Sequence, residues 1–149
     1  MGFRIRKSNA PDGPRLFEVW QTSVTATHSF VSEDDLAAIA NLVREEYLPG
    51  ADLDVVVDAD DNPRAFMGTT GNEIDTLFVH EDARGAGLGR MLVELALTRG
   101  PLICTEVNEQ NGQAVSFWKH MGFHETGRFE FDRQGHAYPL LRMERLAPE

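Results

Sequence analysis

The chain has 149 residues, 42% of them hydrophobic, and its 24 acidic and 14 basic side chains give a net charge of −10. This length and composition suit one globular domain, and we expect residues 1–149 to form it. The negative charge repels polyphosphate, which argues against nucleic acid as a partner and favours a cationic small molecule or a basic peptide.

Simple features also argue against membranes, disulfides and metals. The sequence holds no run of about 18 consecutive apolar residues and starts without the apolar stretch of a secretory signal, so we expect a cytoplasmic protein with no membrane partner. Cys104 is the only cysteine, which precludes an intrachain disulfide or a thiolate metal cluster. His120 and His124 are four residues apart, but Gly122 interrupts the helix between them, and we expect no metal site. The chain could be a monomer or a homodimer.

The first third of the chain predicts one strand and two helices. Residues 3–7 alternate apolar and basic side chains, as in a strand, and residues 11–27 carry apolar side chains at helical spacing. Phe17 and Trp20 belong to that apolar stripe and are expected in the core. A second helix is expected over residues 32–48, because Ser32 opens it with an acid three positions later, the spacing of a capping box.

The middle of the chain predicts a meander followed by a strand–helix–strand unit. Strands are expected over residues 53–59, 64–70 and 73–79, separated by short turn sequences. A helix over residues 89–99 then ends at a Gly-Pro pair, and residues 102–107 form the next strand. A strand, helix and strand in this order predict parallel pairing.

The last third predicts a helix and a closing hairpin. Residues 111–121 form the helix, and residues 123–131 and 136–146 flank a turn at residues 132–135. The whole order is β-α-α-β-β-β-α-β-α-β-β. It indicates an α/β (α+β) protein, with a mixed sheet that carries helices on its faces.

Three glycines stand at the junction between the strand at residues 73–79 and the helix that follows. A helix that starts directly after a strand points its free N–H groups and positive dipole end at the turn, and Gly85, Gly87 and Gly89 let an anion approach them closely. A turn without a ligand fits the same pattern. A dinucleotide fingerprint is excluded because Arg90 stands where it needs glycine, and the Gly-Lys-Ser/Thr end of a P-loop is absent.

These residues carry a resemblance to a known family. Residues 84–89, Arg-Gly-Ala-Gly-Leu-Gly, match the Arg/Gln-x-x-Gly-x-Gly/Ala signature of the GNAT superfamily of N-acetyltransferases, and residues 73–79 resemble that family's fourth strand. Downstream, residues 111–123 are similar to its Asn-x-x-Ala…Gly-Phe motif. The resemblance implies a mixed, mostly antiparallel seven-stranded sheet with about four helices. It also implies transfer of an acetyl group from acetyl-CoA, the co-substrate, to a primary amine.

The resemblance further implies where acetyl-CoA binds. Backbone amides of the signature loop would hold the pyrophosphate, the end of the fourth strand would pair with the pantetheine arm, and Asn111 would contact that arm from the other side. The backbone N–H of Val79 would meet the developing oxyanion. The cofactor-binding residues expected on this basis are Phe78, Val79, Arg84, Gly85, Ala86, Gly87, Leu88, Gly89, Arg90, Asn111 and Trp118.

Acetyl transfer to an amine needs a base, because a lysine-type amine with a pKa of about 10.4 is protonated at neutral pH. Glu73 and Asp75 are the first candidates, since residues i and i+2 of a strand point to one face. The position of Glu73 also matches the catalytic glutamate of histone-type GNAT enzymes. Solvated surface acids would give the same pattern. His28 is a third candidate, and with Phe30 it is expected to line the acceptor pocket.

The leaving thiolate marks a departure from the family pattern. Many GNAT enzymes have a tyrosine four residues before the Gly-Phe pair that protonates the sulfur, whereas this chain has Trp118, whose indole N–H is no acid near neutral pH. Tyr138, expected in the last strand, is the other hydroxyl considered, although a packed aromatic beside Pro139 fits it as well. Tyr47 belongs to the second helix and is expected to lie away from the motifs.

Two functions follow from these expectations. The first is an acetyltransferase in which a cationic small molecule or a protein amino group attacks acetyl-CoA directly in a ternary complex. The second is a GNAT-fold acyl-CoA-binding or regulatory module whose activity is vestigial because Trp118 replaces the acid. The retained acids and signature loop favour the enzyme.

Overall fold

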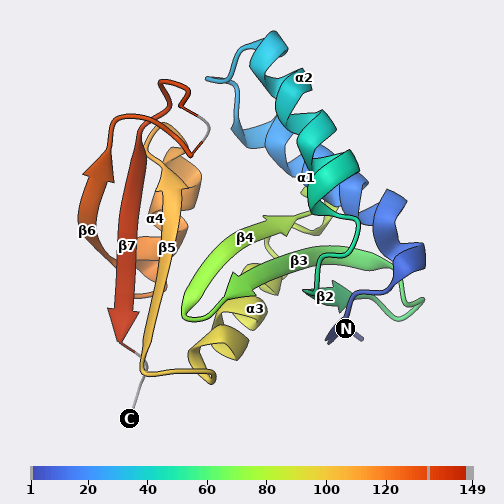
Figure 1. Cartoon of the computed structure of the whole chain (residues 1–149). Helices are drawn as coiled ribbons and strands as arrows, with labels where there is room; N and C mark the ends of the chain where they lie inside the picture. Colours follow the sequence, from blue (N-terminus) through green and yellow to red (C-terminus); the bar gives the residue numbers. More distant parts are fainter. Residues whose placement is uncertain (1, 134, 147–149) are drawn as a thin grey trace. The chain divides into compact units, whose positions relative to one another are not determined.

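The computed structural model describes residues 2–133 and 135–146, and its elements follow the predicted order (Figure 1). Within these residues the seven strands are hydrogen-bonded in the order β1-β2-β3-β4-β5-β7-β6. The strands are β1 (Arg4–Lys7), β2 (Leu53–Val57), β3 (Pro63–Thr70), β4 (Glu73–Val79), β5 (Leu102–Asn108), β6 (His124–Phe129) and β7 (Leu140–Leu146). The α-helices are α1 (Gly13–Thr27), α2 (Glu33–Leu42), α3 (Leu88–Leu97) and α4 (Gly112–His120).

The pairing confirms the mixed, mostly antiparallel sheet. β1 with β2, β2 with β3, β5 with β7 and β6 with β7 are antiparallel. β4 and β5, which flank α3, are parallel, with Glu73 opposite Cys104 and Ile74 opposite Thr105. The strand–helix–strand order had predicted this parallel pair.

Two predicted elements differ from the structure by more than two residues at one end. β7 begins at Leu140 rather than at residue 136, because the N–H of Tyr138 bonds back to His136 O and Pro139 has no N–H to give to a ladder. The second helix changes at Val43 into a π-helical turn, η2 (Val43–Tyr47), in which Leu48 N–H donates to Val43 O over 2.9 Å. Of the predicted turn at residues 132–135, Gln134 lies outside the described residues.

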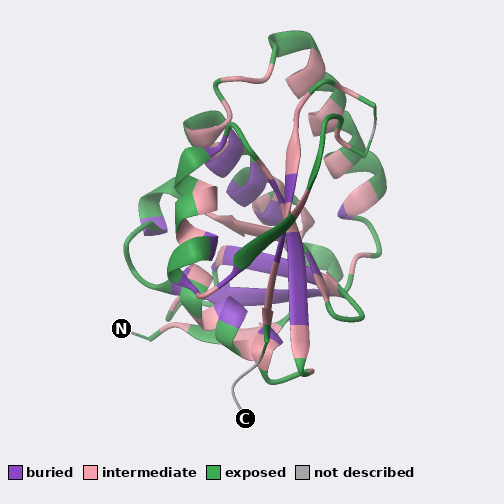
Figure 2. Cartoon of the chain, turned by 90° about the vertical axis from the view of Figure 1, so that its left-hand side faces the viewer, coloured by how far each residue is buried: buried purple, intermediate pink, exposed green. Residues whose placement is uncertain are grey.

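Contacts gather the chain into two compact units. The first, called here the N-terminal unit, comprises Met1–Gly68 and Thr76–Leu92, and the second, the C-terminal unit, comprises Thr69–Asp75 and Val93–Glu149. In Figure 2 the buried positions lie on several strands and on helices, whereas the connecting loops are mostly exposed.

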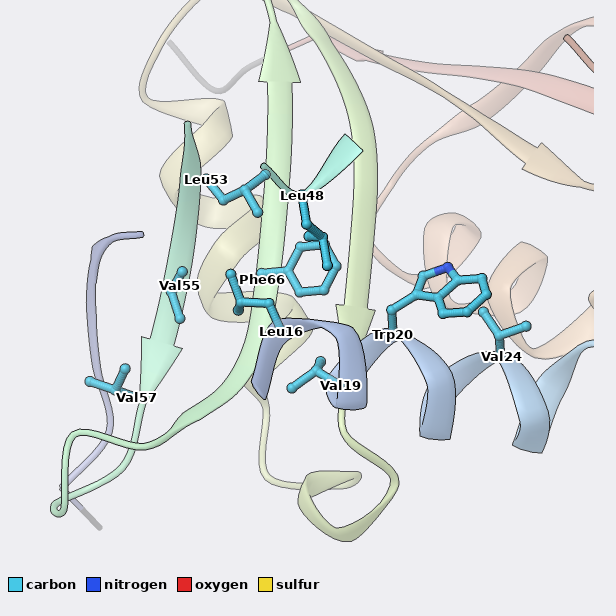
Figure 3. Close-up of a cluster of buried hydrophobic side chains, with 9 residues drawn as sticks. All are labelled: Leu16, Val19, Trp20, Val24, Leu48, Leu53, Val55, Val57 and Phe66. Atoms are coloured by element: carbon cyan, nitrogen blue, oxygen red, sulfur yellow. The ribbon is translucent and has the colours of Figure 1, made fainter. Parts of the chain in front are cut away.

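The core of the N-terminal unit forms where α1 packs on β2 and β3 (Figure 3). The apolar stripe of α1 that the sequence predicts faces the strands, with Val19 fully buried and Trp20 only 4% exposed. The apolar side of α2 and Phe17 pack against the same cluster. The buried members are Leu16, Val19, Trp20, Val24, Leu48, Leu53, Val55, Val57 and Phe66.

In the C-terminal unit, β5, β7 and β6 lie side by side (Figure 1). Side chains along β5 and β7 alternate between a buried face and a polar face. Thr105 faces Met143, and Val107 faces Leu141, in the buried layer, and α4 contacts β5. The alternate positions carry charged side chains and the one cysteine. We call this set the polar face: Glu73, Cys104, Glu106, Arg142 and Glu144.

No helix within residues 2–133 and 135–146 is long and apolar enough to cross a membrane.

Gly68, in β3, gives a first prediction because a side chain has no room there. A Cβ atom at this position would collide with the Tyr47 hydroxyl and lie 2.8 Å from Thr76 Oγ1. We expect Gly68→Ala to lower the free energy of unfolding by about 1–3 kcal/mol in urea denaturation.

The matched control is Gly112→Ala at the start of α4, where nothing lies within 4 Å of the added atom. Its stability should stay within about 0.5 kcal/mol of the parent. In a Tyr47→Phe background the cost of Gly68→Ala should shrink, since the colliding hydroxyl is gone. An equal cost in both backgrounds would contradict the steric explanation.

Candidate functional site

His80 ends β4 and anchors the turn that follows it. Its ring is buried, and Nδ1 accepts a hydrogen bond from Asp82 N over 3.1 Å. The ring proton of the neutral imidazole is therefore on Nε2, which lies 3.4 Å from Glu18 Oε1 on α1 and donates to it. This bond is the main cause that lowers the pKa of Glu18. Helix α1 thus holds the start of the turn.

The signature residues Arg84–Gly89, which we call the glycine loop, have the geometry of an anion site. Gly85 and Gly87 have φ values of +81° and +82°, a conformation that other residues rarely adopt. A Cβ at either position would meet open space, so the backbone is accessible. Helix α3 begins at Leu88, so the N–H groups of its first turn point toward the glycine loop. The loop therefore has the features of an anion-binding turn.

The end of β4 packs into the N-terminal unit. Phe78 and Val79 are half-buried, and the ring of Phe78 lies 5.6 Å from that of Phe66. Phe78 thereby ties the segment expected to meet pantetheine to the core beneath α1.

The sequence had predicted that Tyr47 lies away from the motifs, and this prediction is wrong. Its hydroxyl is 2.9 Å from Thr76 Oγ1 on β4, and the same oxygen accepts the N–H of Gly68 over 3.0 Å. The π turn at the end of α2, which the helical pattern did not indicate, ends with Tyr47. Tyr47 therefore joins the turn η2 to β4, the strand that precedes the glycine loop.

His28 follows α1 and presents a defined tautomer. The Thr27 hydroxyl donates to Ser23 O over 2.8 Å, so the Nδ1–H of His28, 2.7 Å from Thr27 Oγ1, donates to that oxygen. Burial lowers the pKa of His28 from its ordinary value, which keeps the ring neutral at pH 7 with a lone pair on Nε2. Phe30 stacks near it, with ring centroids 5.2 Å apart. The two predicted pocket residues are thus adjacent.

Asn111 has a structural task that explains the motif spacing. Its Oδ1 accepts the N–H of Ala114 over 3.2 Å and caps α4, so the Asn-x-x-Ala pattern is an N-cap and its third helical residue. The side-chain NH2 group supplies two further donors. Trp118 lies in the same helix, is 5% exposed, and packs edge-on against Phe123 at 4.9 Å.

The two predicted acids of β4 have different partners. Glu73 accepts from Arg133 Nη2 at 3.4 Å, and Asp75 accepts from the Thr70 hydroxyl at 2.6 Å. After Glu106, the main cause, both carboxylates also help to raise the pKa of Arg133.

Sequence reasoning missed Glu106 and Arg133. Glu106 accepts from Arg133 Nε at 2.8 Å, and this bond is the main cause of the raised pKa of Arg133. The available signal was a carboxylate inside the apolar strand at residues 102–107. It could have marked Glu106 as a group that needs a partner.

Tyr138 lies in the loop before β7, so its predicted place in the last strand is wrong. Its ring packs edge-on against His136, with centroids 6.1 Å apart. The loop is joined to the residue after β5 by a bond from Glu109 N to Pro139 O, 2.9 Å long.

Comparison with known proteins adds a family and close relatives. The model of the acetyltransferase (GNAT) domain matches residues 26–145. A peptidyl-lysine N-acetyltransferase YjaB of Salmonella typhimurium is 48% identical over 143 residues, which cover 96% of this chain and 98% of the relative. The solution structure of apo-form YjaB from Escherichia coli has a TM-score of 0.92 and 46% identity, with 97% of each chain covered. A GCN5-related N-acetyltransferase from Rhodopseudomonas palustris, 20% identical over 98% of this chain and 96% of its own, shares the fold with a TM-score of 0.80.

The lowered pKa of His28 gives a second prediction. The unfolded chain binds this proton more tightly than the folded one, so the stability gained from the neutral ring is present above the ordinary histidine pKa and is lost as the pH falls below it. Urea denaturation at about pH 7.5 and about pH 5 should show a larger loss for the parent than for His28→Gln. The same loss in both proteins would contradict the half-buried, neutral ring.

Proposed function

The chain belongs to the GNAT family of acetyltransferases, and on this premise we propose that it moves the acetyl group of acetyl-CoA to the lysine side chain of a protein or peptide. The observation that carries the proposal is the glycine loop, whose open, positive-φ backbone stands at the start of α3. The relatives named as peptidyl-lysine N-acetyltransferases support the acceptor class. A protein with a net charge of −10 also suits a basic peptide.

Acetyl-CoA supplies the activated acetyl group as a thioester, and the chain's residues bind and orient it. In this proposal the backbone of the glycine loop holds the pyrophosphate, with the side chains of Arg84 and Arg90 at its two ends. The half-buried end of β4, at Phe78 and Val79, pairs with the pantetheine arm, and Asn111 offers its amide NH2 to it. The Val79 N–H faces the acyl oxygen. The family match spans both compact units, which supports one working domain over residues 1–149.

Two side chains compete for the role of general base. Glu73 has the position expected from the family, and a proton from the lysine Nζ would move to its carboxylate in the ternary complex. His28 offers a lone pair on Nε2 and is neutral at pH 7, which suits a base at that pH. Asp75 is held by the Thr70 hydroxyl and contributes negative charge beside Glu73.

Trp118 favours the second candidate function, an acyl-CoA-binding module with vestigial turnover. Its buried indole packs among aromatic rings and supplies no acid for the leaving sulfur. We favour turnover because a thiolate, with a thiol pKa of about 8.5, leaves without prior protonation at a moderate rate. Tyr138 is the alternative hydroxyl.

Isothermal calorimetry tests the glycine loop. The parent should bind acetyl-CoA in preference to ATP and NAD, and Gly87→Glu should abolish binding because it adds bulk, backbone strain and negative charge where the pyrophosphate lies. Gly100→Glu, just beyond the C-terminal end of α3, adds the same charge at a position with open space and should bind like the parent. Melting curves show whether each variant is folded. Unchanged affinity in a folded Gly87→Glu protein would refute the assignment.

Release of free thiol tests the transfer itself. The parent should release thiol from acetyl-CoA with a lysine-containing peptide and not with the same peptide carrying norleucine. Trp118→Tyr should raise kcat toward the roughly 10²-fold that a general acid contributes, with some loss of stability because the smaller ring leaves space in the buried layer. Acetyl-CoA binding without acceptor-dependent thiol release in either protein would favour the binding module.

A further inference from the structure

Arg133 joins two carboxylates that come from different strands of the C-terminal unit. Its Nε lies 2.8 Å from Glu106 Oε1 on β5, and its Nη2 lies 3.4 Å from Glu73 Oε1 on β4. Arg133 itself belongs to neither strand and comes from the loop between β6 and β7. A single cation therefore pairs with both acids.

The three side chains differ sharply in exposure. The side chain of Arg133 is 69% exposed, whereas those of Glu73 and Glu106 are 28% and 12% exposed. The guanidinium is already mostly in contact with water, so its own transfer into water costs little. The carboxylate of Glu106 is mostly removed from water and needs a cationic partner whether or not Arg133 is there.

The loop holds Arg133 at this place through its own backbone bonds. Asp132 Oδ1 accepts the N–H of His136 over 2.9 Å, and the N–H groups of Asp132 and Gly135 pair with His136 O and Asp132 O. Gly135 has a φ of +82°, which lets the chain close this turn. The guanidinium is thus presented by a closed turn next to the polar face.

We propose that Arg133 is a specificity-determining residue that occupies the acceptor's place: its guanidinium lies on Glu73 and Glu106 as a stand-in for the ammonium group, and the acceptor lysine displaces it. The inference rests on the proposed function, in which Glu73 meets the amine. It adds Glu106 as the carboxylate that binds the incoming cation.

Displacement selects for charge. A protonated lysine replaces one cation by another and leaves Glu106 paired, whereas a neutral or acidic side chain would leave a mostly buried carboxylate without its partner. Displacement also releases the Glu73 carboxylate from its contact with Arg133, so that it can meet the incoming amine.

Steady-state kinetics with the lysine peptide test the competition. Arg133→Gln should lower the KM for the peptide about two- to five-fold, the range set by an exposed ion pair, and leave the KM for acetyl-CoA unchanged. Glu106→Gln should raise the peptide KM. The difference between parent and Arg133→Gln should shrink as salt is raised.

The matched control is Arg128→Gln. Arg128 is an exposed arginine of β6 that pairs with Glu109 at 2.6 Å, so this variant loses the same charge from a comparable ion pair. It should keep the parent's peptide KM. A peptide KM that is unchanged or raised in Arg133→Gln would overturn the proposal.

A binding measurement separates this inference from the proposed function. In ¹⁵N-labelled protein, the Nε–Hε signal of Arg133 should move on titration with Nα-acetyl-lysine methylamide and stay still with the norleucine analogue. If this movement occurs without any thiol release, the transfer proposal fails and the displacement stands. Thiol release from the lysine peptide with an unmoved Arg133 signal would overturn the displacement and leave the transfer proposal intact.

Discussion

Two opposite demands meet at the end of β4, and the functional assignments depend on how they are reconciled. The strand has to be fixed in a buried core, and the backbone directly after it has to stay bare enough to receive an anion. Packing of α1 on β2 and β3 meets the first demand, and Phe78 extends that core to the end of β4. His80 connects the two, since it is buried, bonds to Glu18 of α1, and caps the short turn that precedes the glycine loop.

Asn111 combines a local structural task with the role proposed for it, whereas Thr76 and Gly68 have structural tasks at β4 and β3. Asn111 caps α4 with Oδ1 and retains donors on its amide nitrogen. Thr76 receives the Gly68 N–H and meets the Tyr47 hydroxyl, which joins β3, β4 and the end of α2. A glycine at position 68 is required because the hydroxyls occupy the space of a side chain. Function and folding therefore both constrain Asn111, and a loss of activity in an Asn111 variant has to be compared with its change in stability.

The acidic character of the chain takes a specific form in the C-terminal unit. The polar face gathers Glu73, Glu106 and Glu144, and two arginines compensate them: Arg142 pairs with Glu144 on β7, and Arg133 reaches in from a loop. Arg142 is part of a ladder and is fixed by strand register, with Glu106 directly opposite. Arg133 is held only through a turn and is mostly exposed. Of the two compensating charges, it is the one that an incoming cation can replace.

The sequence alone determined the order of the elements, the parallel pairing around α3, the positions of the glycines and the family. These depend on short-range signals: periodicity, capping residues, turn residues and a motif whose backbone conformation is local. The cap made by Asn111 is equally local, because its acceptor bonds the N–H of Ala114 three residues later. Only the tertiary structure decided that Tyr47 reaches Thr76, that Tyr138 stands in a loop, and that Arg133 joins Glu73 to Glu106. Tyr47 and Thr76 are 29 residues apart and Arg133 and Glu73 are 60 apart. Whether such side chains meet depends on strand register, on the widened last turn of α2 and on the closure of one loop. Those features are set by packing across the sheet, which the sequence of either partner does not contain by itself.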